Sequence, residues 1–427
     1  MGGGLMQLVA YGAQDIYLTG NPQITFFKVV YRRHTNFAIE AIEQVFSGNV
    51  DFGKKTTCTI SRNGDLLANM YLEVDINPSL LNKQDDGKIP NIDGVDTPMK
   101  NISRIGHAMI DYVELEIGGQ AIDKQYGEWM DIWTQLTHSR EQLEKLNRMI
   151  SGNLRQGNTD GEIRKLYIPL HFWFNRNPGL ALPLIALQYH EVKLSVMFKK
   201  SKYVKHPDST VAPVLKNICL FCDYIFLDTD ERRRFAQGSH EYLIEQVQFN
   251  GKTSLSPNES SANIELRFNH PCKEIVWLCQ SELWSTPESS TYSPFKYCNI
   301  EHRDEVKNAV LQLNGHDRFR VRDGTYFRVV QPFQHHTGGH NQSGPILNFA
   351  KDDVKGHFYM YSFAIKPEEH QPSGTCNFSR IDNAVLNLDI DTTPLEGKLQ
   401  SKQVRVYATN YNVLRIMSGM GGLAYSN

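Results

Sequence analysis

Apolar and polar residues alternate with a period of two along most of this chain, and this constrains its fold more than any other feature. In the clearest example, Met70, Leu72, Val74 and Ile76 alternate with polar or aromatic residues. The same pattern returns at 113–117, 192–198, 264–268, 386–390 and 404–406. Strands of this kind bury one face and leave the other polar, which is typical of antiparallel sheets. The chain is therefore predicted to be all-β.

One region has helical rather than strand periodicity. Between residues 125 and 150, apolar residues such as Trp129, Trp133 and Leu136 recur every three or four positions. Ser139 followed by Gln142 is typical of a capping box at a helix start. Two short helices inserted between strands are predicted here.

The two halves of the chain resemble each other. Residues 115–130 and 311–327 both combine an alternating strand, a glycine turn and then aromatic residues, and 311 − 115 gives an offset of 196. The length of 427 residues suits two domains of roughly 200 residues each. We predict an N-terminal arm at 1–25, a first β-domain at 26–228, a linker at 229–240 and a second β-domain at 241–427. The second carries long loops at 280–308 and 331–356 and a C-terminal tail.

Composition excludes several functional classes. Lys and Arg number 45 against 47 Asp and Glu, so the net charge is −2 and no basic half is available to wrap nucleic acid. Two basic clusters, 28–34 and 232–234, are interpreted as solvated faces or as ion pairs between subunits. The longest nearly apolar run, 180–187, is too short for a membrane span.

Processing signals are also weak in this sequence. The first cation is Lys28, which does not fit a secretory signal peptide, and the seven cysteines suit a reducing compartment. Four Asn-x-Ser sequons are candidate glycosylation sites, although unmodified loop asparagines are the simpler interpretation. They are Asn101, Asn258, Asn341 and Asn377.

Two segments resemble phosphate-binding loops without their structural context. In 48–55, Lys55 occupies the position where a phosphate loop needs a hydroxyl, and a strand rather than a helix follows, so a hairpin turn is predicted. The segment 419–424 matches G-x-G-x-x-A but leaves no room for a following helix. It is interpreted as a flexible tail that docks on a neighbour.

Two clusters have metal-ligating residue types. Cys219 and Cys222 have zinc-like spacing but lie within an apolar strand, so packed thiols are predicted. His335, His336 and His340 lie in a Gly-rich segment with no carboxylate closer than Asp352, and a solvated loop is predicted. No metal site and no cofactor is expected.

Long stretches of the chain resemble the major capsid proteins of the large icosahedral nucleocytoplasmic DNA viruses, including those of algae. The stretches that carry the resemblance are 7–40, 60–66, 113–124, 178–194, 223–237, 240–246, 371–384 and 411–425. They include YRRHTNFAIE near the start and NVLRIMSGMGGLAY near the end. Such strings are far more specific than the short motifs above.

The resemblance implies a fold and a function. It implies two tandem eight-stranded antiparallel jelly rolls with short inserted helices, in a structural virion protein that is not an enzyme. It also implies homotrimers of near-hexagonal outline, which tile an icosahedral capsid around an internal membrane after assembly in the host cytoplasm. Expected partners are further copies, neighbouring capsomers, minor capsid proteins and the inner membrane side, with no direct nucleic-acid binding.

The arm is the candidate assembly element. Residues 1–23 are Gly-rich and carry Asp15 as their single charged side chain, so they cannot build a core of their own. Contacts with neighbouring subunits, minor proteins or the membrane-facing side are expected from five apolar side chains. These are Val9, Tyr11, Ile16, Tyr17 and Leu18.

One alternative from another class remains at this stage. Jelly rolls also serve carbohydrate-binding and carbohydrate-active proteins. Such a protein needs paired carboxylates or a calcium cluster. Neither Glu368-Glu369 nor the pair Asp389 and Asp391 makes a persuasive site of this kind.

Overall fold

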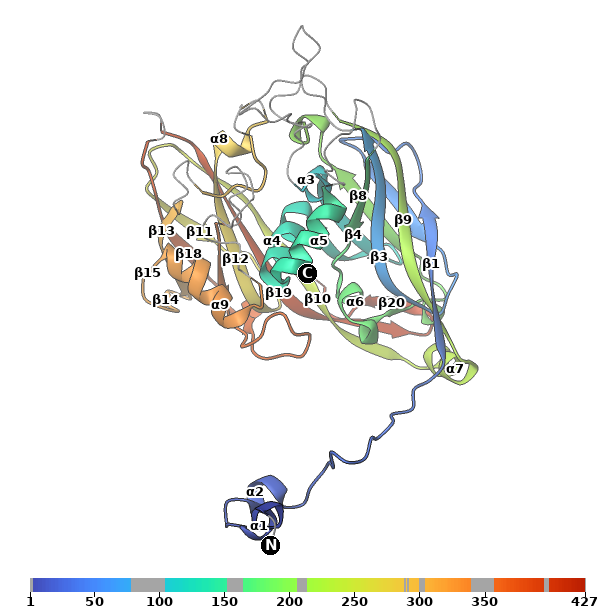
Figure 1. Ribbon diagram of the computed structural model, residues 1–427. Coiled ribbons are helices and arrows are strands. Elements are labelled where there is room, and N and C mark those ends of the chain that lie inside the picture. Colours follow the sequence, from blue (N-terminus) through green and yellow to red (C-terminus); the bar gives the residue numbers. More distant parts are fainter. Residues whose placement is uncertain are drawn as a thin grey trace, which may run out of the picture. The chain divides into compact units, whose positions relative to one another are not determined.

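The computed structural model forms two compact units, residues 1–37 and residues 38–427, and the second contains the described sheets apart from one strand residue, Phe37 (Figure 1). The structure describes residues 3–77, 104–151, 164–205, 213–287, 289, 292–298, 304–338, 357–394 and 399–426. Within the first unit lie two short helices, α1 (Gly3–Val9) and α2 (Ile16–Thr19). In the described part of the chain no helix is both long and apolar enough to cross a bilayer.

The first half of the large unit folds into two antiparallel sheets. One sheet has the order β1 (Phe37–Val45), β9 (Val214–Leu227), β3 (Leu66–Asn77), β6 (Arg164–Pro169), with β7 (Leu182–Pro183) paired to β3. The other has the order β2 (Lys55–Ile60), β8 (Val192–Phe198), β4 (Ile110–Ile117), β5 (Gln120–Tyr126). The chain thus crosses repeatedly between two facing sheets with four main strands each, as in a jelly roll.

The second half repeats this order strand for strand. Its first sheet is β10 (His240–Leu255), β19 (Lys402–Met417), β12 (Pro271–Ser281), β16 (Phe358–Ser362). Its second sheet is β11 (Ser261–Glu265), β18 (Ala384–Ile390), β13 (Val306–Leu313), β14 (His316–Asp317). The short strands β15 (Arg322–Asp323), β17 (Cys376–Asn377) and β20 (Met420–Leu423) add to these sheets. The prediction of two tandem eight-stranded jelly rolls is confirmed.

Each roll encloses its own apolar core, and the strand alternation read from the sequence places the side chains there. Leu72, Val74 and Ile76 of β3 all point into the first core and are at most 1% exposed. Trp277 of β12 lies at the same depth in the second core, between strands of both sheets. One-sided burial of this kind is the main stabilising term of a jelly roll.

Short helices fill the connections between strands. The two that the sequence predicted are α4 (Gly127–Thr137) and α5 (Arg140–Ile150), joined at Ser139. Ser139 accepts a hydrogen bond from the Gln142 amide, and the Gln142 side chain accepts one from the Ser139 amide, which confirms the capping box. The other helical segments are shorter. They are α3 (Ile105–Met109), α6 (Trp173–Arg176), η1 (Pro178–Leu180), η2 (Leu184–Ala186), η3 (Ser201–Tyr203), α7 (Thr229–Gln237), α8 (Glu282–Ser285), η4 (Tyr326–Val330), α9 (Gln331–His335) and η5 (Phe378–Arg380).

The structure also decides several motif interpretations. Residues 55–60 form strand β2, which confirms the strand predicted after the 48–55 turn, and Cys219 and Cys222 lie buried in β9 as packed thiols. The prediction of a flexible, neighbour-docking tail is wrong for residues 420–423. They pair with β19 of their own chain because Ser418 and Gly419, both with positive φ, make a tight hairpin turn.

Candidate functional site

A seam of packed side chains joins the two rolls and fixes them as one body. Helix α4 of the first roll lies on the outward face of β12 and β16 of the second. From the helix, Ile132, Trp133 and Leu136 are at most 4% exposed. They pack in one cluster with Val276, Leu278, Phe358 and Met360, each of which has no exposed surface. Because these side chains are almost completely buried, the seam is packed like the core of a domain.

A buried carboxylate binds the start of α4 to the second roll. Glu128 Oε2 accepts a hydrogen bond from the Tyr407 hydroxyl at 2.6 Å, and its Oε1 accepts one from Tyr297 at 3.1 Å. Arg405 lies 3.2 Å from the same carboxylate. All three partners come from the second roll, so Glu128 is anchored only while the rolls are in contact. Burial, followed by the charge of Glu128, raises the pKa of Tyr407, which therefore stays a proton donor.

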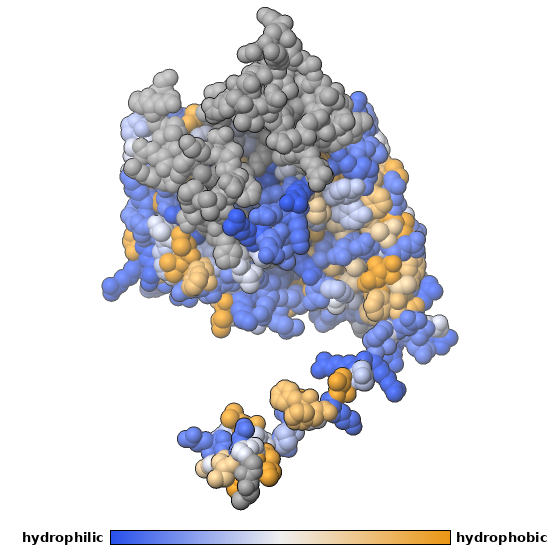
Figure 2. All heavy atoms as spheres, viewed as in Figure 1, coloured by the Kyte–Doolittle hydropathy of each residue, from blue (hydrophilic) through white to orange (hydrophobic). Residues whose placement is uncertain are grey.

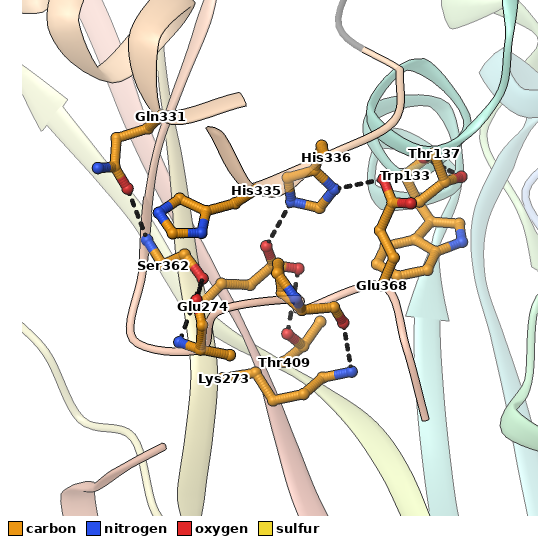
Figure 3. A network of polar contacts seen from close by, with 12 residues as sticks. Trp133, Thr137, Lys273, Glu274, Gln331, His335, His336, Ser362, Glu368 and Thr409 are labelled. Carbon is orange, nitrogen blue, oxygen red and sulfur yellow. Dashed lines mark hydrogen bonds and ion pairs between the residues drawn. The ribbon is translucent and has the colours of Figure 1, made fainter. Parts of the chain in front are cut away.

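The other end of the seam is a histidine held between two carboxylates (Figure 3). His336 Nε2 lies 2.8 Å from Glu274 Oε2, and its Nδ1 lies 2.8 Å from Glu368 Oε1. Since a carboxylate accepts but does not donate, both ring nitrogens carry protons and the ring is an imidazolium. Burial alone would lower the pKa of His336, but Glu274 and Glu368 outweigh it and raise the pKa to about 9.

The residues after His336 cap helix α4 from the opposite roll. The Gly338 amide donates to the Leu136 carbonyl at 2.7 Å, and Thr337 Oγ1 lies 3.0 Å from the Thr137 carbonyl. These carbonyls belong to the last turn of α4, where no intrahelical donor is available. A Cβ atom on Gly338 would lie 2.4 Å from the Leu136 carbonyl oxygen, so this approach needs glycine.

A third buried group, Glu245 of β10, connects the seam to α6. Its carboxylate accepts from Arg176 Nη1 at 2.7 Å and from Lys273 Nζ at 2.9 Å. Burial would raise the pKa of Glu245, but His370, Lys273 and Arg176 outweigh it and lower the pKa to about 2. The Arg176 guanidinium also lies 4.0 Å from the centre of a Trp133 ring, so one side chain joins the ionic and apolar parts of the seam.

The sequence did not predict this seam, and one prediction about it is wrong. His336 was expected in a solvated loop, but it is 8% exposed because Glu274 and Glu368 compensate its charge inside the protein. His335 is less buried and bonds to the Ile365 carbonyl, while His340 lies outside the described residues. The signal was weak, because Glu274 lies 62 residues away in a strand whose centre is apolar.

The arm residues singled out from the sequence are all exposed within the small unit. The exposed fractions range from 56% for Ile16 to 89% for Tyr17. Val9 ends α1, Tyr11 lies between the helices, and Leu18 lies in α2. Three further aromatic residues of the small unit are at least 85% exposed, namely Phe26, Phe27 and Tyr31. Phe27 precedes Lys28 and Tyr31 precedes Arg32, so the pairing of aromatic residues with cations is visible in the sequence.

The remaining candidate residues are dispersed over the surface. Asn258 is exposed in the turn between β10 and β11, and Asn377 is exposed in β17, so both stay candidate glycosylation sites. Asn101 and Asn341 lie outside the described residues. From the basic cluster 232–234, Arg232 pairs with Asp65 of its own chain at 3.0 Å, and an ion pair between subunits stays a prediction for this cluster.

Comparison with known proteins assigns the family. A model described as the major capsid protein N-terminus matches residues 25–228, and a model described as the large eukaryotic DNA virus major capsid protein matches residues 231–422. The chain belongs to the family of major capsid proteins of large eukaryotic DNA viruses. The major capsid protein of Pyramimonas orientalis virus is 49% identical over the full length of both chains. That of Paramecium bursaria Chlorella virus 1 is 43% identical, again over both full lengths.

Solved structures agree with this family assignment. A chain of a quasi-atomic model of the PBCV-1 virus capsid matches with a TM-score of 0.75 and 36% identity, covering 94% of this chain and 100% of that one. The Faustovirus major capsid protein matches with a TM-score of 0.70 at 12% identity, which supports the fold alone. The resemblance seen in the sequence is confirmed, and the chain is a structural protein of the virion capsid.

Proposed function

We propose that this major capsid protein forms homotrimers that act as near-hexagonal building blocks of an icosahedral shell, without catalysing a reaction. One observation carries the proposal: the two rolls have the same sheet order within one body. Three copies would therefore present six equivalent units, which approximates a hexagon. We further propose that the shell encloses an internal membrane and is assembled in the host cytoplasm, as the family resemblance implies.

Light scattering behind a sizing column tests the trimer. The subunit mass is 48.8 kDa, so we expect a stable species of about three times this value when the full chain is purified. A species that remains at the monomer mass at all accessible concentrations would contradict the proposal. The measurement needs no assumption about the shell, and it separates trimer formation from later assembly.

The arm is proposed to act after the trimer has formed. Its exposed apolar side chains, including Tyr17 and Leu18, would bind neighbouring capsomers, minor capsid proteins or the membrane-facing side of the shell. A chain lacking residues 1–20 is expected to form trimers but to assemble shells poorly. Intact shells from the shortened chain, at the yield of the full chain, would show that the arm is dispensable.

A point variant avoids removing backbone from the arm. Replacement of Tyr17 and Leu18 by serine removes two of its most exposed apolar side chains and leaves its length unchanged. The matched control replaces the polar residues Gln7 and Gln14 by serine. We expect the first variant to reduce the shell yield and the control to match the unmodified chain, as measured by electron microscopy of particles.

A further inference from the structure

Two cysteines lie directly opposite each other on neighbouring strands of the second roll. In the antiparallel pair of β12 and β17, Cys272 is the register partner of Cys376. Directly opposite residues of such a pair point to the same face of the sheet, with Cα atoms about 4.5–5.5 Å apart. A disulfide joins residues whose Cα atoms are roughly 4.4–6.8 Å apart. The backbone positions therefore suit a disulfide between Cys272 and Cys376 without movement of either strand.

The side chains of this pair share one environment. Both belong to the apolar core of the second roll, where Cys272 has no exposed surface and Cys376 is half-buried. Burial, and after it the neighbouring Cys376, raises the pKa of the Cys272 thiol. Both cysteines are free thiols in the structure, so the core holds two adjacent sulfur atoms that are not yet bonded.

The other cysteines are not arranged in this way. Among the described residues, no other two cysteines are opposite each other in a sheet. Each of the remaining ones is opposite a residue of another type: Cys58 is opposite Leu194, Cys219 is opposite Glu73, Cys222 is opposite Met70, Cys279 is opposite Val404 and Cys298 is opposite Asp304. The register thus singles out one pair.

This pair lies at the base of a loop. The segment 363–375, called the seam loop below, runs from the end of β16 to the start of β17, and both strands pair with β12. The loop begins beside Lys273, whose carbonyl accepts a hydrogen bond from the Phe363 amide at 2.8 Å. Lys273 Nζ donates to the Pro367 carbonyl at 2.7 Å. A disulfide would fix the far end of the loop to the strand that already holds its near end.

The seam loop carries two side chains that hold the buried ionic groups of the seam. Glu368 lies against one ring nitrogen of His336 (Figure 3), and His370 Nδ1 lies 3.5 Å from the Glu245 carboxylate. The positions of Glu368 and His370 depend on the loop backbone, because neither residue lies in a helix or strand. Covalent closure of the loop would therefore stabilise the ionic end of the seam.

Cys376 is the accessible member of the pair. The residues beside it in the chain, Thr375 and Asn377, are exposed. In Figure 1 the seam loop lies at the lower edge of the large unit next to α9, and Figure 2 shows this edge as mostly hydrophilic. Burial raises the pKa of the Cys376 thiol, but the positive charge of Arg318 opposes this and favours the thiolate. An oxidant in solution would therefore react first at Cys376.

We propose that Cys272 and Cys376 form a modification site, at which a disulfide closes when the protein meets a small-molecule disulfide such as oxidised glutathione. The Cys376 thiolate attacks one sulfur of the oxidant, which releases one small thiolate and leaves a mixed disulfide. The Cys272 thiolate then attacks the Cys376 sulfur and releases the second small thiolate. Two electrons pass from the two cysteines to the oxidant, and the two protons that the cysteines lose are taken up by the released thiolates.

The site would respond to the compartment in which the protein is found, which goes beyond the proposed shell function. Thiols stay reduced in the cytosol, whereas disulfides form and persist in oxidising surroundings such as the outside of a cell. With assembly in the host cytoplasm, as proposed above, the seam loop would stay open during assembly and would be closed in released particles. Disulfide formation within one chain does not require the trimer, so its failure and the failure of the proposed function are distinguishable.

Mass spectrometry of the full chain, before and after incubation with oxidised glutathione, tests the site. Proteolysis without reduction should give one linked peptide that joins Cys272 to Cys376, and dithiothreitol should remove this link. The oxidised chain should have a thermal midpoint at least about 2 °C higher, because a disulfide restricts the unfolded chain. Hydrogen exchange of the amides in the seam loop should become slower on oxidation.

The test variant is Cys376→Ser, and the matched control is Cys219→Ser. Cys376 is half-buried and Cys219 is 5% exposed in the first roll, so each variant is compared with itself before and after oxidation. Oxidised Cys219→Ser should show the link and the higher midpoint, and Cys376→Ser should show neither. A midpoint that rises equally in Cys376→Ser would overturn the proposal. An unmodified chain that keeps glutathione on Cys376, or that links other cysteines instead, would also overturn it.

Discussion

The ion pairs of His336 make the stability of the seam depend on pH in a direction that can be calculated. Folding raises the pKa of His336 from an ordinary value of 6.5 to about 9. A group whose pKa is raised by folding stabilises the folded state fully below its unfolded pKa, and this contribution disappears as the pH rises through the folded pKa. The difference of about 2.5 pH units corresponds to ~3 kcal/mol in the free energy of unfolding.

The prediction is that His336 contributes ~3 kcal/mol near pH 6.5 and almost nothing above pH 9.5. Urea unfolding of the full chain and of His336→Gln, measured at several pH values in this range, gives the contribution as a difference. His316→Gln is the matched control, because His316 is exposed in β14. The urea midpoint of this variant should match that of the unmodified chain.

Two results would refute this reasoning. A difference between His336→Gln and the unmodified chain that stays constant from pH 6.5 to 9.5 would show that His336 is not held as an imidazolium. A difference that grows with rising pH would show the opposite sign of linkage, as expected for a histidine buried in its neutral form.

Other substitutions test the apolar and backbone parts of the seam. Gly338→Ala should lower the free energy of unfolding by roughly 1–3 kcal/mol, because the new Cβ atom would overlap the Leu136 carbonyl and displace the cap of α4. An unchanged urea midpoint would contradict this prediction. Trp129→Ala should lower the free energy of unfolding by about 3–5 kcal/mol, because Trp129 has no exposed surface and its ring centre lies 5.6 Å from that of Tyr407 across the seam. A loss below about 1 kcal/mol in the same assay would mean that the rolls are held together by other contacts.

Much of the fold could be predicted because it depends on local patterns. Leu72, Val74 and Ile76 alternate in the sequence and all point into one core, and Ser139 with Gln142 marks the start of α5. The duplication was visible as an offset of 196 residues between two similar stretches, and the two rolls share one sheet order. The strand alternation and the capping box each lie within a few residues, where the physical constraint acts directly on the backbone or on one face of a strand.

The seam could not be predicted because its partners are far apart in sequence and chemically unremarkable on their own. Glu274 is a single acid in a strand that is otherwise buried, and His336 follows a short helix in a polar segment. Only the fold brings them within 2.8 Å of each other. The prediction of a flexible C-terminal tail is wrong for a related reason. A Gly-rich segment suits both a flexible end and the hairpin that Ser418 and Gly419 form.

Electron cryomicroscopy of the purified oligomer is the most direct test of the claim that three copies of this chain form one near-hexagonal building block. The account predicts a ring of six rolls from three copies, in which α4 of each chain lies on β12 and β16 of the same chain. An oligomer with another number of copies, or one in which the two rolls of a chain are separated, would contradict it.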